Sequence, residues 1–101
     1  MKIREWAELF GALSSEKRLK ILCFIREKKR VCACEIVKFI GDSQPSVSKH
    51  LSILKYLRLV FDEREGNSVY YSLSLPPEVQ ELIDKIAEEN KEVLQLENEC
   101  D

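Results

Sequence analysis

The chain has 101 residues, which is enough for one domain with a modest hydrophobic core. No apolar run is long enough to cross a bilayer, and the charged N-terminus is unlike a signal peptide, so we expect a cytoplasmic protein without membrane contact. The net charge of −2 is unevenly spread: residues 1–40 carry +5, residues 41–75 are neutral and residues 76–101 carry −7. The acidic balance therefore does not exclude nucleic-acid binding by the rest of the chain.

Residues 2–13 predict a first helix, because their apolar positions recur at helical spacing. The apolar stripe, with its Trp and Phe, is large for so small a domain. We therefore expect it to serve the core, a contact with another subunit, or both. The stripe consists of Ile3, Trp6, Phe10 and Leu13, with Leu9 at its edge.

Residues 16–27 predict a second, strongly basic helix with Leu19, Leu22 and Ile25 facing inward. Most of its cations are expected to be solvated, and a few to reach a DNA backbone. Cys23 lies beside the apolar stripe, where a buried, inert thiol is expected.

A third, short helix is predicted to open with Val31-Cys32-Ala33-Cys34 and to end before Gly41, which can adopt the left-handed conformation. Gly41-Asp42 then makes a tight connection to the next helix. Two short helices joined by a glycine-containing turn predict a helix-turn-helix over residues 32–57.

Residues 42–57 form the second helix of this motif, with Ser43 as N-cap and Pro45 in the first turn. One face is apolar and predicts a core contact, although a plain amphipathic core helix is the alternative. The other face carries short hydroxyls and cations, which can enter a major groove and bind base edges and phosphates. The apolar face has Val47, Leu51, Leu54 and Leu57, and the polar face has Ser46, Ser48, Lys49, Ser52 and Lys55.

Residues 58–75 predict a β-hairpin, or wing, because two β-prone runs flank the turn signal Gly66-Asn67. Arg64 and Asn67 are expected to project from the body, where an arginine can lie along a minor groove or the DNA backbone. An isolated hairpin is only marginally stable, so it must dock on the helices. The docking residues are expected to be Val60, Val69 and Tyr71.

Residues 77–98 predict a long last helix with an apolar side and an acidic side. Little of the domain remains for it to pack on, so we expect residues 1–13 and 77–98 to form a homodimer interface. A two-fold axis would then set two DNA-reading helices roughly 34 Å apart. The alternative is a helix folded back on its own domain.

Four fragments together resemble the ArsR/SmtB family of winged-helix, metal-responsive repressors. The resemblance implies a mainly α fold with a small β-hairpin, and a homodimer that leaves double-stranded operator DNA when a metal or metalloid binds. Carried over by position, it implies DNA contacts for Gln44, Ser46, Ser48 and Lys49, and either a backbone contact or a packing role for His50. With Ser52, Arg64 and Asn67 these residues form the predicted DNA-binding set. The fragments are Leu19–Ile25, Val31–Ile36, Asp42–Leu51 and Arg64–Leu73.

Cys32 and Cys34 resemble the arsenic-, cadmium- and lead-type site of that family. The resemblance implies As(III) or Sb(III) as the expected inducer, with cadmium or lead next. This agrees with the residues, because soft thiolates select soft ions and a helix N-terminus favours the thiolate. No metal is needed for the fold. The family's third cysteine position is Val37 here, so the third sulfur must come from elsewhere or from an exogenous thiol. Cys100 is the candidate third ligand and Cys23 the second choice, or Cys100 has no role.

Geometry argues against a simple two-thiol site on a helix. Residues i and i+2 point about 200° apart on a regular helix, so we expect ligation to distort the first turn and displace the helix-turn-helix. A thiol-redox-responsive repressor and a winged-helix interaction module without metal sensing are the alternatives. Catalysis is not expected, because the single histidine has no nucleophilic partner and no phosphate loop is present.

Overall fold

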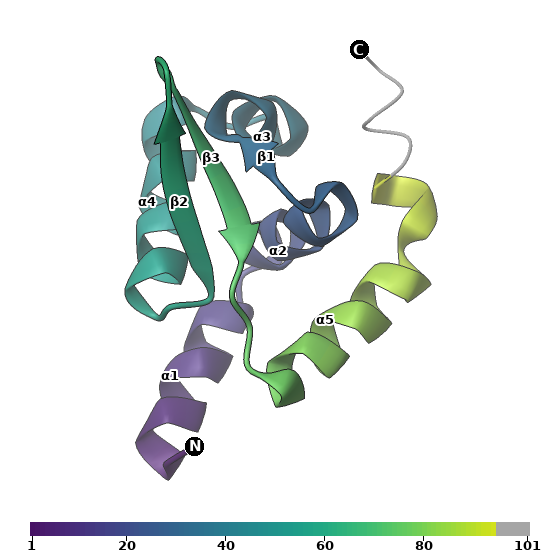
Figure 1. Ribbon diagram of the computed structural model, residues 1–101. Coiled ribbons are helices and arrows are strands. Elements are labelled where there is room, and N and C mark those ends of the chain that lie inside the picture. The colour runs from purple at the N-terminus through teal and green to yellow at the C-terminus, as the bar shows by residue number, and fades with distance from the viewer. Residues whose placement is uncertain (95–101) are drawn as a thin grey trace.

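The computed structural model describes residues 1–94, which form five helices and a small sheet (Figure 1). The predicted mainly α fold with a β-hairpin wing is confirmed. The elements are α1 (Ile3–Leu13), α2 (Glu16–Lys28), β1 (Val31–Cys32), α3 (Ala33–Ile40), α4 (Gln44–Tyr56), β2 (Val60–Glu65), β3 (Ser68–Leu73) and α5 (Pro77–Glu89). No helix within the described residues is both long and apolar enough to span a membrane.

Helix α2 is the centre of the core. It contacts α1, α3, α4, α5 and β3, and all five residues of 21–25 are buried. Because neighbours surround this helix on several sides, it buries more than the single predicted stripe. Cys23 belongs to this buried segment, as expected, whereas Leu19 is only partly buried.

Local capping fixes the helix-turn-helix as predicted. Gly41 ends α3 with a left-handed backbone (φ 74°), which a side chain would strain. Ser43 then caps α4, and its hydroxyl accepts a hydrogen bond of 3.3 Å from the amide of Ser46. Pro45 lies in the first turn, where no helical amide bond is lost.

The sheet contains one strand more than the predicted hairpin. Strands β2 and β3 pair antiparallel around the two-residue turn Gly66-Asn67, as expected, with Glu65 opposite Ser68. Strand β1 adds to the outer edge of β3, with Cys32 opposite Tyr70. The prediction that the third helix begins at residue 31 is therefore wrong by two residues, because this segment is held extended by β3.

Helix α1 buries only part of the predicted stripe: Leu9 at its edge is buried, and Trp6 and Leu13 pack partly buried against the core. Leu9 and Ala12 are almost fully buried (3% and 4% exposed), whereas Ile3 and Phe10 are 88% and 56% exposed. Only the flank that faces the rest of the domain is covered. Two of the four predicted stripe positions are thus available to solvent or to a second chain.

Helix α5 is shorter than predicted and lies on its own domain. It ends at Glu89, and the Asn90 side chain donates a 2.7 Å hydrogen bond to the Ile86 carbonyl before a further helical turn at 91–94. The prediction of a single helix over 77–98 is therefore wrong for residues 77–94, and residues 95–98 lie outside the described part of the chain. The buried residues of α5 are Val79, Ile83 and Ala87.

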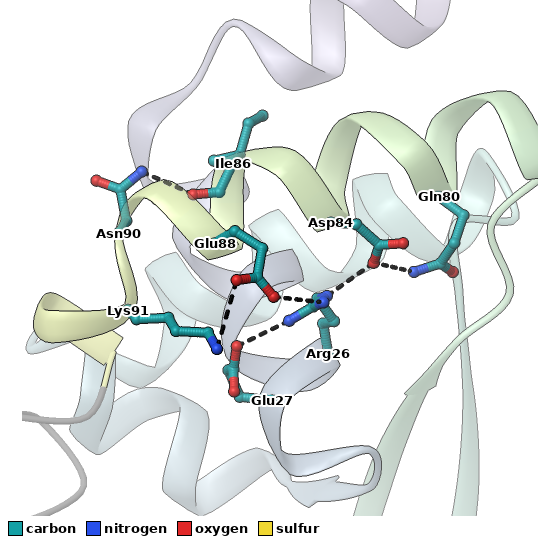
Figure 2. Close-up of polar contacts among 8 residues, drawn as sticks. All are labelled: Arg26, Glu27, Gln80, Asp84, Ile86, Glu88, Asn90 and Lys91. Atoms are coloured by element: carbon teal, nitrogen blue, oxygen red, sulfur yellow. Dashed lines mark hydrogen bonds and ion pairs between the residues drawn. The ribbon is translucent and has the colours of Figure 1, made fainter.

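An ionic cluster centred on Arg26 joins α5 to α2 (Figure 2). The Arg26 guanidinium donates to Asp84 at 2.7 Å and lies 3.6 Å from the Glu88 carboxylate, both on α5. It also bonds Glu27 at 2.9 Å. One face of α5 is thus occupied by its own domain, while Leu82 on the same helix stays 40% exposed.

Candidate DNA-binding surface and thiol site

Helix α4 is amphipathic, with one face in the core and the other open. Its apolar residues Val47, Leu51 and Leu54 are buried against the domain. The opposite face therefore meets solvent along its length and can approach a nucleic acid. The predicted DNA-binding residues that are exposed on it are Gln44, Ser48, Lys49 and Ser52.

Ser46 differs from these residues because its hydroxyl is engaged within the chain. It donates a 2.8 Å hydrogen bond to Asp42, whose carboxylate also pairs with Lys17 on α2. The bond from Lys17, followed by those from Ser46 and the Ser43 amide, holds the pKa of Asp42 well below its usual range. An ionised Asp42 thus ties the start of α4 to α2.

His50 makes a second polar contact between the same helices. Its Nδ1 lies 3.1 Å from the Arg18 guanidinium, which also donates 2.8 Å from Nε to the Ala12 carbonyl. Burial and the positive charge of Arg18 lower the pKa of His50, so its ring is neutral and accepts from Arg18. Two roles were expected for His50, a contact with the DNA backbone and a packing role. The contact with Arg18 fits the packing role.

The wing extends beyond the helices, with Arg64 and Asn67 exposed near its tip. Arg30, which directly precedes β1, holds this hairpin. Its guanidinium lies 4.0 Å from the centre of the Tyr70 ring and donates to Glu65 at 2.7 Å. The sequence indicated Arg30 only as part of a basic run, since no local pattern links it to a strand forty positions later.

Cys32 and Cys34 lie side by side at the start of α3. Cys32 is the N-cap residue with an extended backbone (φ −68°, ψ 143°), and Cys34 lies in the first helical turn. Their Cα atoms are 5.2 Å apart, the two sulfurs are paired as a disulfide, and the Cys34 amide donates to the Cys32 sulfur at 3.3 Å. Because Cys32 precedes the helix with an extended backbone, the 200° separation of a regular helix does not apply to this pair, and the two sulfurs meet. That ligation of an ion distorts the first turn stays a prediction.

No third thiol joins this pair among residues 1–94. Cys23 is a separate, buried thiol, and burial raises its pKa to about 11, which disfavours the thiolate. Within the described residues no group of three His, Cys, Asp or Glu side chains forms a metal site. Cys100, the predicted third ligand, lies outside them.

A cavity of about 380 Å³ separates α3, α4 and the wing tip. It brings the cysteine pair together with three of the predicted DNA-binding residues, Gln44, Ser48 and Asn67. The sequence placed these residues on three different elements but gave no sign that they share one space. Its other lining residues are Ala33, Val37, Val47, Leu51, Ser68 and Val69.

Comparison with known proteins agrees with this geometry. Residues 15–61 match the family model described as bacterial regulatory protein, arsR family. The arsenic resistance transcriptional regulator ArsR2 of Pseudomonas putida is 34% identical, over 86% of this chain and 77% of its own length. A CadC homolog of Staphylococcus aureus, a cadmium resistance transcriptional regulatory protein, is 33% identical, over 89% and 74%.

Solved structures show the same fold. Reduced HlyU from Vibrio cholerae superposes with a TM-score of 0.75 at 30% identity, covering 82% of this chain and 85% of its own. The transcriptional repressor PagR of Bacillus anthracis reaches 0.72 at 26% identity, covering 83% and 94%. The likeness to the regulators extends over most of each chain, and the protein belongs to the ArsR family as a DNA-binding transcriptional regulator rather than an enzyme.

Proposed function

We propose that the protein is a homodimeric repressor that leaves its operator when a thiophilic metal or metalloid binds Cys32 and Cys34. The observation that carries this proposal is the meeting of the two sulfurs at the start of α3. Thiolates prefer soft ions, and two relatives are named for arsenic and cadmium resistance. As(III) or Sb(III) is the first expected inducer, with cadmium or lead next, and the site of action is the cytoplasm.

In this proposal α4 enters the major groove of double-stranded DNA and the wing follows the backbone or minor groove. The exposed residues Gln44, Ser48, Lys49 and Ser52 contact bases and phosphates, and Arg64 and Asn67 extend the contact along the wing. Ser46 and His50 contribute through the orientation of α4, because both are bonded to residues of their own chain.

The test compares DNA release by the wild type with release by a double variant. Reduced protein is bound to a fluorescent DNA fragment from its own promoter, and anisotropy is followed during titration with arsenite or cadmium. We expect the inducer to weaken DNA binding at least about tenfold in the wild type, and to have no effect on C32S/C34S. C23S is the matched control and should respond like the wild type.

Release of DNA by the double variant would refute the proposal, as would a wild type that no thiophilic ion affects. Steep loss of DNA affinity with added salt is expected in the absence of inducer, because the protein contacts phosphates.

Counting the thiols lost on arsenite binding, in wild type and in C100S, tests the third ligand. A drop from three to two in C100S supports Cys100.

A redox-responsive repressor is the second candidate, and the paired sulfurs of Cys32 and Cys34 favour it. Two thiols would give two protons and two electrons to a peroxide, forming one S–S bond while the peroxide is reduced to water. Mild peroxide should then release DNA with a mass loss of two hydrogens per chain. Release by arsenite but not by peroxide would reject this candidate.

A further inference from the structure

Helix α4 carries three serines, and Ser46 is the one whose hydroxyl is bonded within the domain. Its oxygen donates a 2.8 Å hydrogen bond to the Asp42 carboxylate. Ser48 and Ser52 are exposed, and their hydroxyls have no hydrogen-bond partner within residues 1–94. Such free hydroxyls rotate to donate or to accept as a ligand requires, whereas the bonded hydroxyl of Ser46 does not.

The surroundings of Asp42 set the direction of this bond. Its carboxylate accepts from the Lys17 ammonium on α2 and, at 2.8 Å, from the Ser43 amide, in addition to the Ser46 hydroxyl. Three donors converge on one carboxylate, which therefore stays ionised and has no proton to give. The single proton of the Ser46 hydroxyl thus points at Asp42, and the oxygen offers only lone pairs to a molecule outside.

Ser46 lies where a DNA base can meet that oxygen. It is the third residue of α4, and the N-terminal residues of the second helix in a helix-turn-helix contact base edges in the major groove. The residue is half-buried, at the edge of the exposed face of α4, so part of it stays open to solvent. An oxygen in this position can contact DNA while its proton is held inside.

The chemistry of the major groove restricts the partners of such an oxygen. Phosphate oxygens only accept, and so do N7 and O6 of guanine and O4 of thymine. The hydrogen-bond donors in the groove are the amino groups of adenine and cytosine. An oxygen that only accepts therefore gains a hydrogen bond from an amino base and is opposed by a keto base.

We propose that Ser46 determines sequence specificity by accepting a hydrogen bond from the amino group of adenine or cytosine, and that Asp42 is the positioning residue that fixes this polarity. The inference rests on the proposed function, in which α4 enters the major groove, and adds base recognition to the orienting role of Ser46. Each base pair presents one amino group in the major groove, on one of its strands. The preference is thus for A or C over G or T at one position of one strand.

The experiment measures the DNA affinity of the reduced protein by anisotropy, without inducer, on its promoter fragment and on every single-base substitution of the protected site. In the wild type we expect one position per half-site at which A or C binds about three- to tenfold more tightly than G or T. Removing only the amino group, with purine for adenine or 2-pyrimidinone for cytosine, should cause the same loss. S46A should abolish the difference at this position, and S46T, which retains the hydroxyl, should keep it.

D42N tests where the polarity comes from. One carboxylate oxygen accepts from the Ser43 amide, and the other accepts from Lys17 and Ser46. An asparagine that keeps its oxygen toward the Ser43 amide presents its NH₂ group to Ser46, whose hydroxyl then turns outward and donates. D42N should therefore reverse the preference at this position, from A or C to G or T.

Two control variants leave the Ser46–Asp42 bond intact. E16Q neutralises the carboxylate of a separate ion pair on α2, with Lys20 at 3.4 Å, and S48A removes a hydroxyl whose direction is free. Both should retain the wild-type preference at the Ser46 position.

The outcomes separate this inference from the proposed function. A wild type that binds its promoter without an amino preference, or a preference that S46A leaves intact, would overturn the role of Ser46. A D42N variant that weakens binding to all sequences equally and keeps the preference would overturn the role of Asp42. Absence of any sequence-specific DNA binding by the wild type would instead refute the proposed function.

Discussion

Two polar contacts of single residues orient α4 on α2, and both need the deprotonated form of a side chain. Asp42 must be ionised to hold Lys17 and Ser46, and its lowered pKa ensures this down to strongly acidic solution. His50 must be neutral at Nδ1 to accept from Arg18. Both conditions are met near neutral pH, but only His50 titrates close to it.

We expect His50 to make the protein less stable as the solution is acidified. Its pKa in the folded state is lowered from 6.5, so the unfolded chain takes up a proton first and stability falls as pH drops below about 6.5. H50Q removes this titration while retaining a polar side chain. Urea unfolding at about pH 7 and about pH 5 should show a smaller loss of stability in H50Q than in the wild type. Equal losses in the two proteins would contradict the assignment, since Asp42 does not titrate in that interval.

Among the elements, the wing depends on a residue outside it. Arg30 stacks on Tyr70 of β3 and pairs with Glu65 and Glu63 of β2, so it contacts both strands of the hairpin. Strand β1, which follows Arg30, also pairs with β3 through Cys32. The wing is therefore held by the same short segment that carries the first thiol.

R30M should loosen the wing without unfolding the domain. It removes the charge and the stacking but keeps an aliphatic chain, so we expect faster hydrogen exchange across residues 60–73 and DNA affinity lowered by about three- to tenfold. K29M removes a neighbouring exposed charge and serves as control. An equal loss of DNA affinity in both variants, with unchanged exchange in the wing, would mean that Arg30 acts only through its charge.

The elements that local signals specify were predictable from the sequence. Ser43, Gly41 and the Gly66-Asn67 turn each act on the backbone within a few positions, so the helix-turn-helix and the hairpin were correctly predicted. Strand β1 was not, because two residues show no alternation and their partner strand is distant in sequence. The end of α5 at Glu89 depends on Asn90. It was not predicted, because the apolar repeat in the sequence continues beyond this residue.

The candidate site was predictable in its residue types but not in its shape. Cys32 and Cys34 stand out from their spacing alone, whereas their meeting depends on the extended backbone that β3 imposes on Cys32. The shared cavity needs three segments to converge, and Gln44 and Asn67 give no local sign of it. The meeting of the two sulfurs and the shared cavity therefore follow from tertiary packing, which the local sequence pattern does not reveal.

For the whole molecule, the acidic helix α5 and the proposed DNA-reading helix α4 both pack on α2. Helix α2 contacts both α4 and α5, and Figure 1 shows it between them. The strongly acidic last quarter of the sequence thus includes a helix that lies away from the proposed DNA surface. This arrangement lets α4 approach phosphates despite the overall charge of −2.

The exposed apolar side chains of α1 and α5 lead to the last prediction, on assembly. Phe10 on α1 and Leu82 on α5 are 56% and 40% exposed, and burying them against a second copy removes apolar surface from water. F10E should weaken a homodimer at least about tenfold, about 1.4 kcal/mol, measured by sedimentation equilibrium. F61E is the matched control, because Phe61 on β2 is similarly exposed at 46% but lies outside both helices. In F10E, binding to a two-half-site operator should weaken in step with dimer loss, while binding to a single half-site should not change. A dimer as stable in F10E as in F61E would exclude this face of α1 from the interface.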